Sequence, residues 1–368
     1  MDHFIEKYRA NSDLLKFRRR DEVLTNIIES FGLEVLKAFE NVQLLILKPD
    51  AVCSGKALGI TEFLVEHGVE VLGAWPLFSL SEHHYEELYR YNIDLDHKKP
   101  MVGAVWHLRN QFVDHPSIAC LITTTPGIAE RQVYEVTRSL KGDSTPLMSQ
   151  SGQIRFDFNG ASKAMNLVHM SDDPISTLRE LRVFFKEDFI RGPLHTLCDR
   201  RRTDDTSRST MFQAARCVPT QTTDADFPAA TLRVLLMITS QLATEAPPFS
   251  KHIESFDLPA AHNGPRERLL ALDGFFQTLV KKDFSTFCPA TSLSFRANAL
   301  LQVSKVLLEM RSWDTQRIRY CRGVLKSFDM TINEWDFQML FSNAVFNDAL
   351  KAALQPITKS STPLEGAI

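Results

Sequence analysis

Apolar residues along this chain fall into two patterns. Short, nearly continuous apolar runs, such as VQLLIL at 42–47 and SIACLI at 117–122, predict buried strands. Segments with apolar residues three or four positions apart predict amphipathic helices over about 56–66, 81–91 and 174–185. Strands that alternate with amphipathic helices indicate an α/β or α+β layer fold.

The same patterns predict how the chain is divided. Further strands are predicted over 69–80 and 165–168, and a helix is predicted to start at Pro126. The second half contains five helical patterns separated by turns that carry proline or glycine, which predicts an all-helical domain. The predicted division is a helical extension (1–40), an α+β domain (41–190), a polar linker (191–225), a helical domain (226–358) and a flexible tail (359–368).

Aromatic residues of the predicted helical domain fall at helical spacing. Trp313, Tyr320 and Trp335 are the largest of them. Such spacing is typical of core packing and argues against a cofactor pocket. The sequence gives no specific role to this half of the chain.

Composition and charge narrow the classes of partner. The chain has 368 residues with 42 basic and 45 acidic side chains, a net charge of −3, so neither nucleic acid nor an anionic membrane is expected as a partner. The six scattered cysteines fit neither a disulfide framework nor a zinc-ligand pattern. No segment approaches the ~20 apolar residues needed to span a membrane and none resembles a signal peptide, so a cytoplasmic location is expected.

Two segments carry candidate chemistry. In LKPDAV, Lys48 ends a predicted strand and comes just before a turn, although strand-terminal lysines are usually solvated. In NLVHMSDDP, His169 follows an apolar run and precedes a helix; a single histidine there is more often structural. Glu180, eleven residues later on that helix, can reach back to one imidazole nitrogen and leave the other as a nucleophile.

Cationic and hydroxyl side chains lie between these two segments. Arg131 and Thr137 are six residues apart on a predicted helix and its exit, and Arg155 lies in GQIRFDF, which is predicted to be an extended segment after a polar loop. Phosphoryl transfer to a histidine needs mainly positioning and cations around the phosphates. Each arginine alone would be read as a surface residue, so the prediction depends on the set.

Together these segments resemble the nucleoside diphosphate kinase family over residues 41–190. LKPDAV is similar to the family's lysine motif, and NLVHMSDD to its active-site histidine motif, whose usual form is Asn, two apolar residues, His-Gly-Ser-Asp. The intervening spacing also agrees with the family, as does an aromatic pair at 184–185. The matching positions are Ser81 with Tyr89, Arg131 with Thr137, Arg155, Asn166 and Glu180.

The resemblance implies a fold and an activity. The implied fold is a four-stranded antiparallel, ferredoxin-like sheet with helices packed on it. The implied enzyme is a nucleoside diphosphate kinase, which transfers the γ-phosphoryl of ATP or another nucleoside triphosphate to a nucleoside diphosphate through a phosphohistidine, here at His169. Mg²⁺ would be held by the nucleotide's phosphates with no metal site in the protein, and the subunits would form a homo-oligomer.

The resemblance also assigns roles to single residues. The imidazole of His169 would be supported by Ser171 and Glu180. Lys48 would hold phosphate and take part in catalysis. The remaining implied contacts to the nucleotide are phosphate by Arg131 and Arg155, hydrogen bonds from Tyr89 and Thr137, the sugar hydroxyl by Asn166, and the base by Met101.

Three departures from the family pattern leave alternatives open. Met101 stands where the family stacks the base on a phenylalanine, and the segment between Thr137 and Arg155 is longer than the family loop, which commonly takes part in subunit contacts. Met170 replaces the glycine after the histidine and either crowds the phosphohistidine or points away. The alternatives are a nucleotide-binding regulatory or interaction protein without turnover, or an enzyme that passes the phosphate to a different acceptor.

Overall fold

The structure of the protein is a computed structural model. It describes residues 20–78, 80–95, 115–125, 132–198, 204–218, 225–244, 246–281 and 293–355. The predicted tail at 359–368 therefore lies outside the described residues, as does most of the helix predicted from Pro126.

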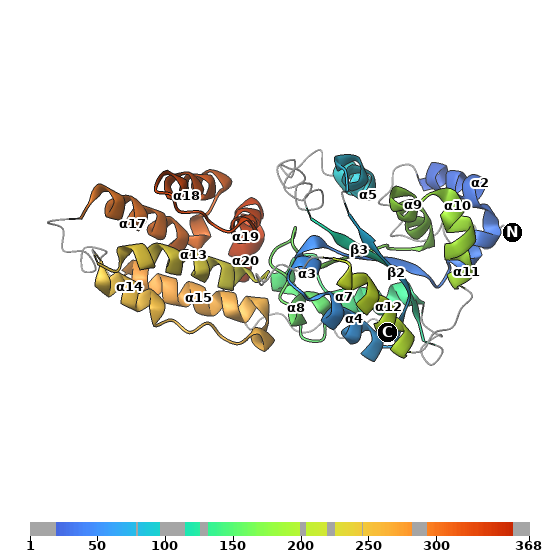
Figure 1. The fold of residues 1–368 in the computed structure, drawn as a ribbon, viewed down its shortest axis with the longest axis horizontal. Coiled ribbons are helices and arrows are strands. Elements are labelled where there is room, and N and C mark those ends of the chain that lie inside the picture. The colour runs from blue at the N-terminus through green and yellow to red at the C-terminus, as the bar shows by residue number, and fades with distance from the viewer. Residues whose placement is uncertain are drawn as a thin grey trace.

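A four-stranded antiparallel sheet forms the centre of the first half of the chain (Figure 1). Its strand order is β2-β3-β1-β4, with β1 pairing β3 on one side and β4 on the other. β1 is buried along its whole length, as its continuous apolar run predicts. The strands are β1 (Gln43–Leu47), β2 (Val69–Leu77), β3 (Ser117–Thr124) and β4 (Val168–Met170).

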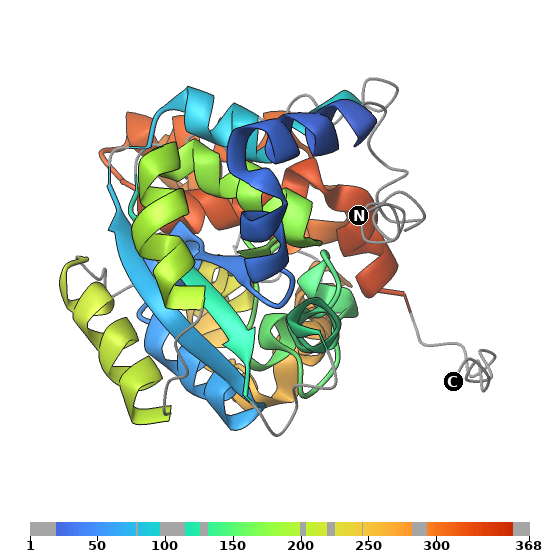
Figure 2. The same ribbon diagram turned by 90° about the vertical axis from the view of Figure 1, so that its right-hand side faces the viewer.

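Helices cover both faces of this sheet (Figures 1 and 2). Leu44 and Ile46 of β1 pack into one apolar cluster and Leu45 and Leu47 into another, because neighbouring strand residues point to opposite faces. The first face is covered by α2 (Arg20–Ala38), α5 (Glu82–Leu95) and α9 (Pro174–Phe184). The second is covered by α4 (Ala57–Glu66), α7 (Val133–Lys141) and α12 (Asp204–Arg216). The ferredoxin-like α+β fold predicted from the sequence is thus confirmed.

Short elements connect these strands and helices. α3 follows β1 directly, η2 and α8 lie between α7 and β4, and α10, η3 and α11 follow α9. Their bounds are α3 (Pro49–Cys53), η2 (Pro146–Met148), α8 (Ile154–Asp157), α10 (Glu187–Phe189), η3 (Ile190–Leu194) and α11 (His195–Cys198).

Residues 225–355, called here the helical region, are helical throughout their described elements, as predicted. Side chains at helix starts cap the free backbone N–H groups: Asp226, Ser294 and Asp314 each accept from the N–H three residues on. The elements are α13 (Phe227–Leu242), α14 (Pro247–Glu254), η4 (Ala261–Asn263), α15 (Gly264–Lys281), α17 (Phe295–Leu308), η5 (Met310–Ser312), α18 (Thr315–Ser327), α19 (Glu334–Val345) and α20 (Asn347–Ala353).

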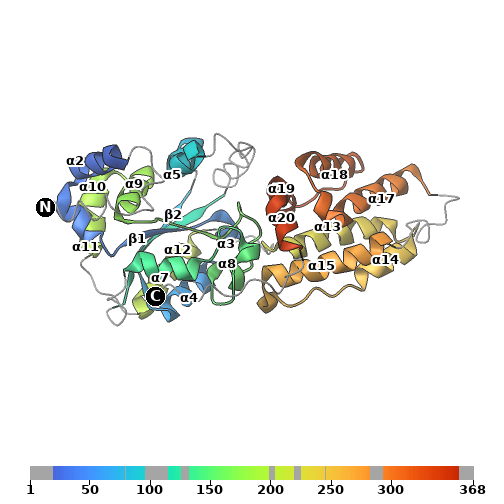
Figure 3. The ribbon, with the colours of Figure 1, turned by 180° about the vertical axis from the view of Figure 1, so that it is seen from behind.

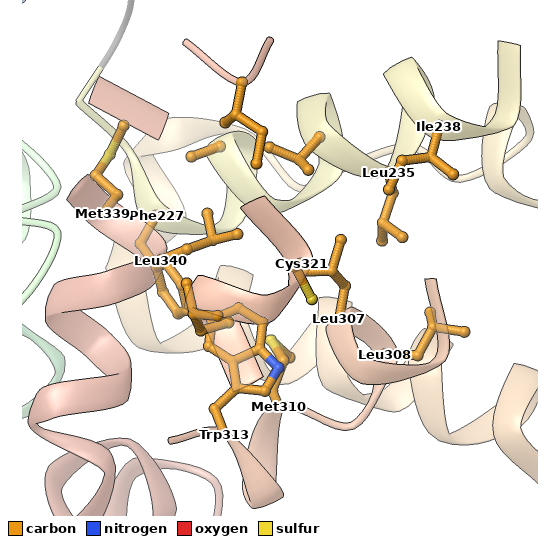
Figure 4. Close-up of a cluster of buried hydrophobic side chains, with 14 of the residues drawn as sticks. Phe227, Leu235, Ile238, Leu307, Leu308, Met310, Trp313, Cys321, Met339 and Leu340 are labelled. Atoms are coloured by element: carbon orange, nitrogen blue, oxygen red, sulfur yellow. The ribbon is translucent and has the colours of Figure 1, made fainter. Parts of the chain in front are cut away.

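One apolar core holds the helical region together (Figure 4). Trp313 is 1% exposed and lies edge-on to Phe227, with a centroid distance of 5.8 Å. Trp335 is also buried, but Tyr320 is 53% exposed, so the predicted core role of Tyr320 is wrong. No helix in the described ranges is both long enough and apolar enough to cross a membrane.

Three local expectations from the sequence are also wrong. Residues 204–216, within the stretch expected to be an irregular linker, form α12, which packs against β2 and α4. Arg155 lies in the short helix α8 and not in an extended segment. The strand expected at 165–168 occupies 168–170 because Leu167 has a φ of 73°, which strand residues do not adopt.

The helical region packs against the sheet region near the turns on either side of α8 (Figures 1 and 3). Its apolar core includes Cys53, Leu147, Ala161 and Met165, which all precede the helical region in the chain. The segment between Thr137 and Arg155, longer than the family loop, contains η2, and η2 contacts α15 and α20. This segment therefore lies against the chain's own helical region.

Candidate active site

His169 lies in the middle of β4, opposite Ile46 of β1. Cross-strand partners point to the same face, so the imidazole emerges on the face covered by α5 and α9. α9 begins after Asp173, whose carboxylate accepts from the N–H of Ser176 at 2.8 Å. This start directs the helix back across the strand, and Glu180 Oε2 comes to 2.8 Å from His169 Nε2.

Glu180 is a buried carboxylate with three hydrogen-bond donors. Besides His169, Ser171 Oγ donates to it at 2.6 Å and Arg179 Nη2 at 2.7 Å. Burial alone would raise the pKa of Glu180, but His169, Arg179 and Ser171 together outweigh burial and lower it. The carboxylate is therefore ionised at neutral pH and accepts the Nε2 proton, which leaves the lone pair of His169 on Nδ1.

Tyr89 of α5 lies beside the imidazole. The two ring centroids are 5.4 Å apart and the rings meet at 70°. Burial raises the pKa of Tyr89 well above its usual 10, and the charges of Glu180 and Asp50 add to this. The phenol is therefore neutral and retains its O–H donor.

Lys48 follows β1 in an extended conformation, two residues beyond Ile46, and so projects from the same sheet face as His169. It is 2% exposed, and its Nζ donates to the Ala164 carbonyl and, at 2.9 Å, to Asn166 Oδ1. Burial lowers the pKa of Lys48 to about 8, helped by Arg155 and opposed by Asp50. The ammonium is thus charged at neutral pH but is held far from bulk water.

The turn before the histidine is fixed by residues 48 and 50. Lys48 donates its N–H to the Leu167 carbonyl at 2.9 Å, and Leu167 donates its N–H to Asp50 Oδ2 at 2.8 Å. These two bonds hold Leu167 at its positive φ of 73°. The lysine motif and the histidine motif are therefore joined through the main chain as well as through Asn166.

Arg155 is hydrogen-bonded to the backbone of the histidine strand β4. Its guanidinium donates to the carbonyls of Gly142 at 2.9 Å and Val168 at 3.3 Å. Burial lowers the pKa of Arg155 to about 10. Lys141, at the end of α7, interacts electrostatically with Arg155, and burial likewise lowers the pKa of Lys141.

Thr137 lies behind the histidine strand. The residue is 1% exposed, its hydroxyl donates to Gln43 Oε1 at 2.8 Å, and Gln43 Nε2 donates to the Ser171 carbonyl at 2.6 Å. In this structure the threonine thus supports the backbone next to His169. Arg131 and Met101, the other two predicted site residues, lie outside the described residues.

Four site residues were missed by sequence reasoning: Asp50, Gln43, Lys141 and Arg179. Asp50 belongs to the quoted lysine motif and Arg179 is adjacent to Glu180, so their positions offered a signal. Nothing in the local sequence distinguishes Lys141 or Gln43 from an ordinary helix-end lysine or strand residue.

Met170 points away from the site. It pairs with Leu45, and its side chain is buried in the cluster on the opposite face of the sheet. Of the two alternatives left open by the sequence, the side chain therefore takes the one that does not crowd the histidine.

These observations define a class: a ferredoxin-like α+β protein with a carboxylate-bound histidine on one strand and buried cations at the neighbouring strand end. Comparison with known proteins identifies the family within this class. Residues 41–190 match the family model described as nucleoside diphosphate kinase. The chain is 32% identical over 154 residues to a nucleoside diphosphate kinase of Pyrococcus horikoshii, a match that covers 39% of this chain and 85% of that protein.

Other relatives agree. A nucleoside diphosphate kinase of Pyrococcus abyssi is 30% identical over 152 residues, covering 40% of this chain and 85% of that protein. Among solved structures, this chain is similar to a halophilic nucleoside diphosphate kinase from Halobacterium salinarum in complex with CDP. That match has 24% identity, covers 40% of this chain and 90% of that chain, and has a TM-score of 0.34. This chain belongs to the nucleoside diphosphate kinase family, whose chemistry is nucleotide phosphotransfer; the helical region lies beyond the matched residues.

Proposed function

We propose that this protein transfers the γ-phosphoryl of a nucleoside triphosphate to a nucleoside diphosphate by a ping-pong mechanism through His169. The observation that carries the proposal is the 2.8 Å contact between His169 Nε2 and an ionised Glu180, on the sheet face that also carries Lys48. An imidazole held in this way has a fixed tautomer and one free lone pair.

In the first half-reaction, the Nδ1 lone pair of His169 attacks the γ-phosphorus. The bond from phosphorus to the β–γ bridging oxygen breaks, and the nucleoside diphosphate leaves with that electron pair. Positive charge develops on the imidazole as the N–P bond forms, and the carboxylate of Glu180 stabilises it through the Nε2–H bond. In the second half-reaction, a terminal phosphate oxygen of another nucleoside diphosphate displaces Nδ1.

Phosphate charge is held by the cations around this histidine. Lys48 supplies an ammonium that the turn before β4 fixes in place, and Tyr89 supplies a neutral O–H beside the imidazole. Arg155, which bonds to the Asn166 and Val168 carbonyls, and the nearby Lys141 add further positive charge. The proposal from sequence resemblance also includes contact of Arg131 with phosphate, a hydrogen bond from Thr137 to the nucleotide, and contacts of Asn166 with the sugar and of Met101 with the base.

Mg²⁺ would enter with the nucleotide. Over the described ranges, no three His, Cys, Asp or Glu side chains are grouped as a metal site. Bound to the triphosphate, the ion would neutralise part of the phosphate charge. The residues present fit this arrangement, since the cations Lys48, Arg155 and Lys141 near the histidine suit the phosphates of a nucleotide.

The substrates follow from the same site. The partners proposed are ATP and other nucleoside di- and triphosphates. A cytoplasmic location and self-assembly also belong to the proposal.

Incubation with γ-labelled ATP and Mg²⁺ tests the function. The unmodified chain should acquire acid-labile label and lose it on addition of GDP or CDP. His169→Asn should take up none, and the matched control His67→Asn should behave as the unmodified chain, because His67 is exposed and its ring bonds to the Phe63 carbonyl on its own helix. Label retained in His169→Asn would refute the proposal. ATP binding without any label would favour the non-catalytic alternative.

A further inference from the structure

The segment that holds Lys48 is a tight turn closed by its own hydrogen bonds. Met165 accepts at its carbonyl from the N–H groups of Ala161, at 2.8 Å, and Ser162, at 3.0 Å. Ser162 Oγ accepts from the N–H groups of Ala164 and Met165 at 3.2 and 3.0 Å. Because four of its five residues are bonded to one another in this way, we expect the 161–165 turn to move as one unit.

One side of the 161–165 turn faces the phosphate-binding groups. The Ala164 carbonyl accepts from Lys48 Nζ, and the next residue after the turn, Asn166, accepts from the same ammonium. Arg155 also bonds to the Asn166 carbonyl at 3.3 Å. A shift of the turn therefore shifts the acceptors that set the position of the ammonium.

The other side of the 161–165 turn is held by the helical region. Asn343 of α19 donates from Nδ2 to the Ala161 carbonyl at 2.9 Å, and also lies 2.9 Å from the Met339 carbonyl one turn back on its own helix. Asn343 and Ala161 are 3% and 1% exposed, so water does not replace this bond. Met165 is fully buried in the core of the helical region.

Lys48 and Asn343 of the helical region thus donate to two different carbonyls of one short turn, those of Ala164 and Ala161. We propose that Asn343 is a positioning residue for phosphoryl transfer, which places the helical region among the determinants of the active site. The proposal rests on the proposed function, because it gives Lys48 the phosphate. It also gives residues after 225 a role in catalysis although they lie outside the matched family.

Removing the amide donor should move the turn. In Asn343→Leu, the buried Ala161 carbonyl loses its partner, and the turn relaxes toward water or toward another donor. Displacement of a positioning group by about 1 Å can reduce a rate by ~100-fold, so we expect labelling of His169 by ATP to slow by about 10- to 100-fold. Loosening the turn also hydrates Lys48, whose pKa of about 8 should rise toward its usual 10.5.

The matched control is Asn347→Leu. Asn347 likewise donates from its amide to a buried carbonyl, that of Trp313, but inside the helical region. This control separates lost stability from lost positioning. Asn343→Ser, which retains a shorter donor, is a milder second variant should the leucine variant not fold; it should show an intermediate loss.

Two quantities should be measured on the full chain, below the melting temperature of every variant. The first is the rate of label uptake at saturating ATP and Mg²⁺. The second is the titration midpoint of the Lys48 amine, obtained by competitive acetylation with acetic anhydride across pH and mass spectrometry of the peptides. The second does not depend on turnover.

Slower uptake and a raised Lys48 midpoint in Asn343→Leu, with neither in Asn347→Leu, would support the proposal. An unchanged rate, a slower rate with an unmoved midpoint, or equal effects in both variants would overturn it. If the unmodified chain takes up no label but the midpoint rises only in Asn343→Leu, the proposed function fails and the positioning of Lys48 by Asn343 stands.

Discussion

Replacing Glu180 by glutamine isolates the role of one charge. The amide has nearly the same shape as the carboxylate and can still accept from His169 Nε2. Of the three bonds to Glu180, those from Ser171 and Arg179 join groups whose charge is the same before and during the reaction. Only the bond from His169 becomes stronger as Nδ1 attacks phosphorus, so the rate effect comes mainly from this bond.

The magnitude follows from the charge at that bond. A hydrogen bond to a charged group contributes about 1.5–3 kcal/mol, and each ~1.4 kcal/mol is tenfold in rate. Glu180→Gln should therefore slow phosphohistidine formation by about 10- to 150-fold at saturating ATP. The affinity for ATP should change little, since Glu180 lies behind the imidazole relative to the attacking nitrogen.

Rapid-quench measurement of label uptake in a single turnover is the appropriate assay, with Glu187→Gln as control. Glu187 pairs with Arg182 at 2.9 Å, but its side chain is 41% exposed, and such a surface pair contributes less than about 1 kcal/mol. The control should keep the unmodified rate. A Glu180→Gln rate within about twofold of the unmodified chain would refute the role assigned to the carboxylate.

Glu180→Gln should also change how the melting temperature depends on pH. Glu180 has a pKa in the folded protein below its ordinary 4.5, so its charge stabilises the fold fully at pH values above 4.5. That contribution is lost as the pH falls through the folded-state pKa. The difference in melting temperature between the unmodified chain and Glu180→Gln should therefore shrink on acidification, and a difference that grows would contradict the sign of this pKa shift.

Three further predictions concern other residues. Because Lys48 has a pKa of about 8, kcat/KM for ATP should fall on the alkaline side with a midpoint near pH 8; a flat profile to pH 10 would contradict this. Met170→Ala should lower the free energy of unfolding by about 2–5 kcal/mol in denaturant titration, yet leave label uptake unchanged, because that side chain fills the far face of the sheet. In native protein a thiol reagent should modify exposed Cys217, while Cys120 and Cys321, whose pKa values burial raises to about 12, should react only after unfolding, as peptide mapping would reveal.

Much of the sheet region could be predicted because its signals are local. The apolar run of β1 is buried along both faces, so its sequence pattern is continuous. α9 has helical spacing and a proline at its first position. The resemblance to a known family then added the four-stranded antiparallel arrangement, which no local pattern contains.

The errors also have physical causes. α8 has four residues, too few to show a helical period, so the sequence around Arg155 predicts an extended segment. β4 was placed too early, since a positive φ at Leu167 is imposed by Lys48 and Asp50 from more than a hundred residues away in the chain. The α12 segment did carry a signal, because Ser207, Met211, Ala214 and, just after the helix, Val218 are four, three and four apart and all buried. The signal is weak because Ser207 and Ala214 are small and only two of the four are larger apolar residues.

The docking of the helical region could not be predicted at all. The bond from Asn343 to Ala161 joins residues 182 positions apart, and an asparagine in an amphipathic helix reads as a solvent-facing residue. Its role depends entirely on which surface that helix meets.

α12 has a consequence for how copies of this chain can associate. The strand order leaves β2 at the edge of the sheet, and α12 packs beside it, with Ser207 Oγ accepting from the Val71 N–H at 3.0 Å. An uncovered edge strand is a template for pairing with another chain. A neighbouring molecule that extended the sheet through Val71 would first have to displace this helix. α12 therefore competes with strand pairing between copies of the chain at this edge.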